Sequence, residues 1–168
     1  MIRTSKNNDS KPQSHSDAKK LVSGPLKFDI EKLDNKFYRV DLQFHGIDHS
    51  GPSYEGRVFI NNPQADQNTA TTLKNGYVGS YHIFGHARCF GDVGHCEIRR
   101  AISPFDYRPS HPLTPAFKRI RITDQIKKIG NDRKELVVTI VPILSGSLED
   151  QNEDVVKLER ISIVSYNK

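Results

Sequence analysis

The chain has 168 residues, of which 35% are hydrophobic and 27% are charged, and its formal net charge is +5. This length fits one domain with a sizeable core, because folded chains of about this size bury roughly two thirds of their surface. No apolar run approaches the ~20 residues of a membrane span, and the first twenty residues lack the apolar stretch of a secretion signal. We therefore expect no membrane association and a cytoplasmic location.

The first twenty residues carry much of the positive charge. They contain five basic and two acidic residues and are rich in Ser, Asn, Asp and Lys. Such a segment buries too little apolar surface to offset the entropy lost on ordering. We predict a disordered basic tail over residues 1–20 and a single domain over residues 21–168. In the domain, charges of both signs are interspersed, so no nucleic-acid groove is expected.

From residue 21 onward, short runs of alternating apolar and polar residues are separated by clusters of Gly, Pro, Asn and Asp, a pattern typical of an all-β domain. Residues 36–44 predict a half-buried strand. Its apolar face consists of Tyr38, Val40, Leu42 and Phe44. Further strands are predicted over 57–60 and 77–84. The second contains Gly79, where we expect a neighbouring backbone or side chain to approach closely.

The segment after residue 116 predicts a strand followed by a short helix. Residues 117–123 place Ile120 and Ile122 on an inward face between outward arginines. Residues 124–129 have the composition of one helical turn, and the Gly and Asn that follow indicate a turn.

The two last strands differ in their patterns. Residues 135–144 are apolar on both faces, which predicts a strand at the centre of a sandwich. In residues 155–166 the apolar residues move from even to odd positions. A bulge near Glu159 and Arg160 would bring both sets onto the same face of the strand. Six or more strands with connections of very different length predict an antiparallel β-sandwich of Greek-key type with long loops.

One stretch concentrates chemically reactive side chains. Both cysteines and three of the seven histidines fall between residues 82 and 96. Thiolate and imidazole ligands together suit zinc or copper. The four candidate metal ligands are His86, Cys89, His95 and Cys96. Candidates for supporting these ligands or the loop are His82, Asp92, Asp106, Arg108 and His111.

Two other interpretations of the cysteine and histidine stretch stay open. The spacing matches no established zinc-ribbon pattern, and adjacent residues such as His95 and Cys96 point to opposite faces in a strand, so only a loop would let both bind one metal. Alternatively, Cys89 and Cys96 form a disulfide, which a reducing cytosol disfavours. In the other interpretation, the thiols and imidazoles only fix a long loop by packing.

Signs of catalysis are weak. Residues 103–115 contain four prolines and predict an extended, ordered connection. Nucleophile-elbow, phosphate-loop and dinucleotide motifs are absent, so we expect a chain that is not an enzyme. The alternatives are a small stand-alone zinc metalloprotein, hydrolytic with Asp92 or Glu97 as base, and a ligand-binding sandwich, although no Trp is present to form an aromatic platform.

Four segments, in this order, resemble the C-terminal domain of tyrosinase-like polyphenol oxidases: residues 37–42, 53–63, 77–86 and 135–142. The resemblance spans residues 28–166. It is strongest for a bacterial variety in which a Phe-Gly-His loop is followed by Cys, Gly-Asp and Gly-His-Cys, as in residues 84–96. The plant-type relative shares the strand order and lacks the Cys/His loop.

This resemblance implies a β-sandwich that packs over a tyrosinase-like copper oxidase domain, its expected partner. The implied role is that of a non-catalytic accessory domain that shields the oxidase site or assists copper loading, with zinc or copper as possible metals in its own loop. A dicopper centre needs six histidines on a helical scaffold. With seven histidines in total, one of them in the predicted tail and one in the proline-rich connection, this chain has no such set.

Overall fold

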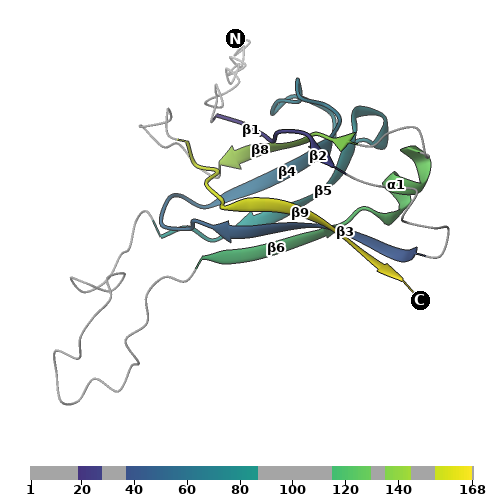
Figure 1. Cartoon of the computed structure of the whole chain (residues 1–168). Helices are drawn as coiled ribbons and strands as arrows, with labels where there is room; N and C mark the ends of the chain where they lie inside the picture. Colours follow the sequence, from purple (N-terminus) through teal and green to yellow (C-terminus); the bar gives the residue numbers. More distant parts are fainter. Residues whose placement is uncertain (1–18, 28–36, 87–114, 130–134, 145–153, 168) are drawn as a thin grey trace, which may run out of the picture.

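The computed structural model describes residues 19–27, 37–86, 115–129, 135–144 and 154–167. Two antiparallel sheets lie face to face as a sandwich (Figure 1). The four-stranded sheet has the order β1 (Leu21–Val22), β8 (Val138–Leu144), β4 (Tyr54–Ile60), β5 (Tyr77–Ile83). The three-stranded sheet has the order β6 (Ala116–Arg121), β3 (Phe37–Ile47), β9 (Arg160–Asn167). A short pair joins β2 (Leu26–Lys27) to β7 (Glu135–Leu136).

The connections give the Greek-key relation that the sequence predicts. The chain passes from β3 to β4 in the opposite sheet, forms the β4–β5 pair, and returns through a long connection to place β6 beside β3. A fourth strand that returns to lie beside the first is the mark of this topology. The prediction of an all-β antiparallel sandwich is confirmed.

The space between the two sheets holds the main core. Alternate residues of β3 point into it, and Val40, Leu42 and Phe44 are completely buried. β4 and β8 contribute Val58 and Ile140 from the other side. The period-two pattern of the sequence therefore identified the inward face of β3, except that Tyr38, at the start of the strand, is 54% exposed.

β8 is buried on both faces, as its composition predicts. Its outward residue Val141 packs with Phe59 and Ala65 in a second, smaller apolar cluster. Ala65 belongs to the segment between β4 and β5, which also contains the 3₁₀ turn η1 (Leu73–Asn75). This segment covers the outer side of the four-stranded sheet, so β8 and β4 need apolar residues on both sides.

The predicted helical turn is present as α1 (Thr123–Ile129) at one end of the sandwich (Figure 1). Thr123 fixes it to β3, because its Oγ1 accepts a hydrogen bond from the backbone N–H of Val40 at 2.9 Å. Ile126 is buried against the core. No helix within the described ranges is long and apolar enough to cross a membrane.

The expected single strand over residues 155–166 needs correction. β9 begins at Arg160, and residues 154–159 approach it as irregular chain, with Val156 buried. No register shift lies near Arg160: the β3–β9 pair shifts between Phe37 and Arg39, at the other end of β9. The apolar residues change from even to odd positions because those before residue 160 belong to a loop and not to the strand. The loop is joined to β3 by a hydrogen bond from the Glu159 N–H to the His45 carbonyl at 3.0 Å.

Candidate functional site at the β3–β4 arch

Two of the nine predicted site residues, His82 and His86, lie in the described part of the chain. The other seven lie outside the described residues: Cys89, Asp92, His95, Cys96, Asp106, Arg108 and His111. The disordered tail predicted over residues 1–20 also lies outside them, apart from Lys19 and Lys20. Lys20 donates a hydrogen bond from Nζ to the Ala65 carbonyl at 3.1 Å.

His82 and His86 have different surroundings. His82 lies on β5, where its neighbours Tyr81 and Ile83 point into the core, so its own side chain is exposed on the outer face of the sheet. Its cross-strand partner is Glu55 of β4. His86, three residues beyond the end of β5, turns instead towards the β3–β4 arch, which we define as residues 48–53.

Two hydrogen bonds join the arch to the segment that follows β5. Gly85 donates its backbone N–H to Ser53 Oγ at 2.9 Å, and His86 donates its backbone N–H to the His49 carbonyl at 3.0 Å. A Cβ at position 85 would collide with the carbonyl of Gly51. Glycine at this position therefore lets the segment lie directly against the arch.

The imidazole of His86 is oriented by the same carbonyl. His86 Nδ1 lies 3.3 Å from the His49 carbonyl oxygen, and the two imidazole rings meet edge to face at 5.0 Å between centroids. A carbonyl only accepts, so Nδ1 carries the proton in this hydrogen bond. In the neutral ring, the lone pair is then on Nε2. Histidines that bind metals are typically held in this way, with the second nitrogen bonded to a carbonyl or carboxylate.

The Nε2 lone pair of His86 is therefore available to accept a hydrogen bond or to bind a metal, but one imidazole does not make a metal site. Within the described ranges, no group of three or more His, Cys, Asp or Glu side chains is close enough to hold a metal ion. The three other predicted ligands follow His86 within ten residues along the chain. The described residues thus supply one oriented imidazole, His86, just before the predicted loop.

Sequence reasoning missed His49 and Ser53. They precede the predicted loop by more than thirty residues, and no spacing motif connects them to it. Asp48 stabilises the arch by accepting the backbone N–H of Ser50 at 2.9 Å, and this hydrogen bond lowers the pKa of the Asp48 carboxyl. A short turn of Asp, Ser, Gly and Pro was the available signal for the arch.

Two phenols lie in the core where β4 leaves the arch. Tyr54 and Tyr81 are buried, their rings are 6.2 Å apart, and neither hydroxyl has a hydrogen-bond partner among the described residues. Burial raises the pKa of Tyr54 and, more strongly, that of Tyr81. The two phenols therefore remain neutral at physiological pH.

A cavity of about 470 Å³ lies away from the arch, between η1 and α1. Its polar lining includes Asn61, Asn62, Lys74, Tyr77 and Lys128. The described residues that line it include no carboxylate, histidine, cysteine or serine.

The fold has known parallels. Two solved structures of recombinantly expressed latent aurone synthase, a polyphenol oxidase, are similar to this chain. One, co-crystallised with hexatungstotellurate(VI), gives a TM-score of 0.51 at 13% identity and covers 89% of this chain and 24% of that chain. The other gives 0.50 at 12% identity and covers 96% and 29%. This chain shares its fold with one part of a polyphenol oxidase.

The similarity is one of fold, and it covers only a part of each polyphenol oxidase chain. This chain spans 24% and 29% of the length of the two polyphenol oxidase chains. No protein-family model and no curated protein matches it.

Proposed function

We propose that this chain is a non-catalytic accessory domain of a tyrosinase-like copper oxidase system. It docks on the oxidase domain, shields the oxidase site or assists its copper loading, and binds a metal of its own through the Cys/His loop. The observation that carries the proposal is the coverage of the fold match: 89% of this chain corresponds to 24% of a polyphenol oxidase chain. In that protein the same fold accompanies a much larger remainder.

The arch supports the metal-binding part of the proposal. Here His86 and the three later ligands Cys89, His95 and Cys96 would hold zinc or copper. Zinc would stabilise the loop, and thiolates would favour Cu(I) for transfer. The role of the described residues is to position the first ligand: the His49 carbonyl orients the His86 imidazole, and Ser53 fixes the backbone just before it.

Elemental analysis and intact mass of untagged protein test the metal site. We expect near-stoichiometric zinc or copper, with loss of the metal in Cys89→Ser and His95→Ala. His82→Ala is the matched control, because His82 is exposed on β5 and should leave the metal content unchanged. Metal-free protein whose mass is lower by about 2 Da would instead show a disulfide between the two cysteines.

Co-purification tests the docking. The tagged chain, expressed in its own cells, should recover a protein that mass spectrometry identifies as tyrosinase-like, and the purified pair should reassociate. If the source cells contain such an oxidase and the chain does not bind it, the accessory role is wrong. A hydrolytic activity lost in His95→Ala without loss of stability would favour the zinc enzyme instead.

A further inference from the structure

The outer face of the three-stranded sheet has an unusual set of side chains. Because Val40, Leu42 and Phe44 point into the core, the alternate residues of β3 point outward. Residues directly opposite one another on neighbouring strands share a face. We define the arginine face by the charged and aromatic residues that this register places outside: Arg119, Arg121, Arg160, His45, Phe117 and Tyr166.

The register fixes where the arginines lie. Arg119 is opposite Gln43 and Arg121 is opposite Asp41, both across the β3–β6 pair. Arg160 is opposite His45 on the other side of β3. The three guanidinium groups therefore come from both edge strands of one sheet.

The positive charge of this face is not compensated by the described residues. Arg119, Arg121 and Arg160 are exposed, and none of them takes part in an ion pair between described residues. The carboxylate nearest to the centre, Asp41, is completely buried and already paired with Arg39. Glu159 stands at the margin of the sheet, where its side chain lies over Gly46.

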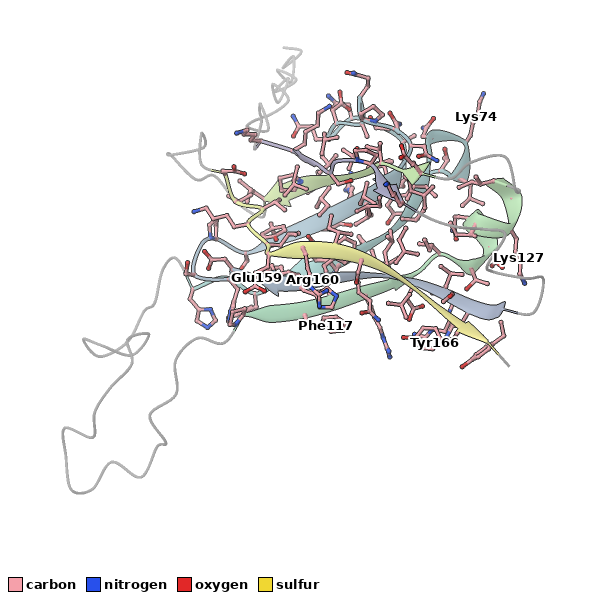
Figure 2. The ribbon with its side chains drawn as sticks, in the orientation of Figure 1. Lys74, Phe117, Lys127, Glu159, Arg160 and Tyr166 are labelled. Carbon is pink, nitrogen blue, oxygen red and sulfur yellow. The ribbon has the colours of Figure 1, made fainter. Side chains whose placement is uncertain are left out.

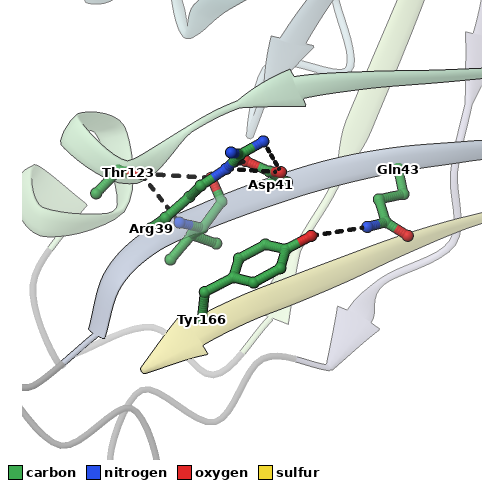
Figure 3. A network of polar contacts seen from close by, with 6 residues as sticks. Arg39, Asp41, Gln43, Thr123 and Tyr166 are labelled. Atoms are coloured by element: carbon green, nitrogen blue, oxygen red, sulfur yellow. Dashed lines mark hydrogen bonds and ion pairs between the residues drawn. The ribbon is translucent and has the colours of Figure 1, made fainter. Parts of the chain in front are cut away.

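The aromatic part of the face is pre-organised. Arg39 lies over the Tyr166 ring at 5.3 Å, and the Tyr166 hydroxyl is 3.4 Å from Gln43 Nε2 (Figure 3). At the other end, Phe117 is 51% exposed and contacts the His45 ring at 5.1 Å between centroids. Figure 2 shows Phe117, Arg160 and Tyr166 along this side of the molecule. Ordered side chains lose less entropy on binding.

We infer that the arginine face is the docking surface of this domain and that its partner presents a carboxylate-rich protein surface. The inference rests on the proposed function, because it names the surface by which the domain meets the oxidase. Arginine and exposed aromatic residues are enriched at protein interfaces, and the uncompensated positive charge calls for negative charge opposite. A nucleic-acid strand also binds arginines and rings, but the fold's place as part of a larger enzyme chain favours a protein.

Charge reversal with a matched control tests the inference in the co-purification experiment described above. Arg119→Glu/Arg121→Glu places two carboxylates on the arginine face. Lys74→Glu/Lys128→Glu changes the net charge by the same amount at the η1–α1 cavity, and Figure 2 shows Lys74 on the opposite side of the molecule. All four residues are exposed, and circular dichroism should show that both variants fold.

We expect the wild type and the lysine variant to recover the oxidase and the arginine variant to recover at least ~10-fold less. Binding of the wild-type pair should weaken between about 0.1 M and 1 M salt, since the screening length falls from ~10 Å to ~3 Å. Equal recovery by all three proteins, or equal loss in both variants, would overturn the inference and leave the docking proposal intact. If the wild type recovers no oxidase, the proposed function itself is wrong, and the inference falls with it.

A labelled single-stranded oligonucleotide separates the other class of partner. We expect no binding to the wild type at about 0.15 M salt. Binding that is lost in the arginine variant and retained in the lysine variant would make this a nucleic-acid surface and overturn the inference.

Discussion

At the scale of single residues, Asp41 departs most from the alternating pattern of β3. It occupies an outward, polar position, yet its side chain is completely buried. A carboxylate without water needs a charged partner, and Arg39 supplies one through Nε to Oδ1 at 2.8 Å and Nη2 to Oδ2 at 2.5 Å (Figure 3). The hydrogen bond with Asp41 raises the pKa of Arg39.

This pair predicts an asymmetry between its two members. Asp41→Asn should lower the free energy of unfolding by about 1 kcal/mol, because the amide still accepts a hydrogen bond. Arg39→Gln should be more harmful, because it leaves a buried carboxylate without its counter-ion, whereas the side chain of Arg39 can reach solvent. Urea unfolding of both variants and of the double variant measures this. A double variant less stable than Arg39→Gln alone would contradict it.

The two buried phenols predict a loss of stability at alkaline pH. In the unfolded chain Tyr54 and Tyr81 ionise near pH 10, whereas burial keeps the pKa of both higher in the folded state. Their contribution is therefore complete below pH ~10 and is lost as the pH rises above it, by up to about 1.4 kcal/mol per pH unit for each tyrosine. Unfolding midpoints measured across pH ~9 to ~11 should show this decline.

Tyr81→Phe is the control for the alkaline transition. It should reduce the decline above pH ~10, because one ionisable group is removed. At neutral pH it should leave stability unchanged or raise it by about 1 kcal/mol, since a buried hydroxyl without a partner is lost. An unaltered alkaline decline in this variant would show that other groups cause it.

At the scale of elements, β5 is shaped by Gly79, which the sequence identified as a point of close approach. Its φ is 140°, a backbone conformation that residues other than glycine rarely adopt. A Cβ there would lie 3.1 Å from Ile120 Cγ2 of β6 in the opposite sheet. The β4–β5 register shifts at the same level, between Val58 and Phe59.

Gly79→Ala should therefore cost about 1–3 kcal/mol of stability, chiefly through backbone strain. Gly24→Ala is the matched control, because a Cβ at position 24 meets no atom within 4 Å and should change stability little. Thermal unfolding of both variants measures the difference. Equal midpoints for the two variants would show that β5 relaxes freely at this position.

At the scale of the whole molecule, two apolar clusters share the four-stranded sheet. The inter-sheet core contains Leu42 and Phe44, and the outer cluster contains Phe59 and Val141. Phe59 and its neighbour Val58 lie on adjacent positions of β4 and face opposite clusters. Both clusters therefore depend on the same strand, β4.

We expect Phe59→Ala to cost about 3–5 kcal/mol and Leu42→Ala about 2–5 kcal/mol. Each variant should still unfold in one cooperative transition, because the two clusters share β4 and β8. Far-ultraviolet circular dichroism and tyrosine fluorescence, recorded in the same urea titration, should give coincident curves. Separate transitions for the two signals in Phe59→Ala would show that the outer cluster unfolds independently.

The sequence by itself determined the fold class, the inward residues Val40, Leu42 and Phe44 of β3, the helical turn α1 and the burial of β8 on both faces. These features depend on local periodicity and composition, which the order of residues states directly. The resemblance to polyphenol oxidases rests on four segments of the sequence and not on periodicity, and the fold comparison agrees with it at the level of the fold. Local periodicity placed β9 too early, because the buried residues before Arg160 belong to a loop.

Only the tertiary structure decided which distant residues meet. The arch brings His49 and Ser53 to His86 and Gly85 across more than thirty residues, and the sheet register gathers Arg119, Arg121 and Arg160 on one face. The burial of Asp41 likewise depends on neighbouring strands. Periodicity gives the face on which a side chain lies, whereas strand order and register decide what lies opposite it, and these are set by packing between segments far apart in the chain.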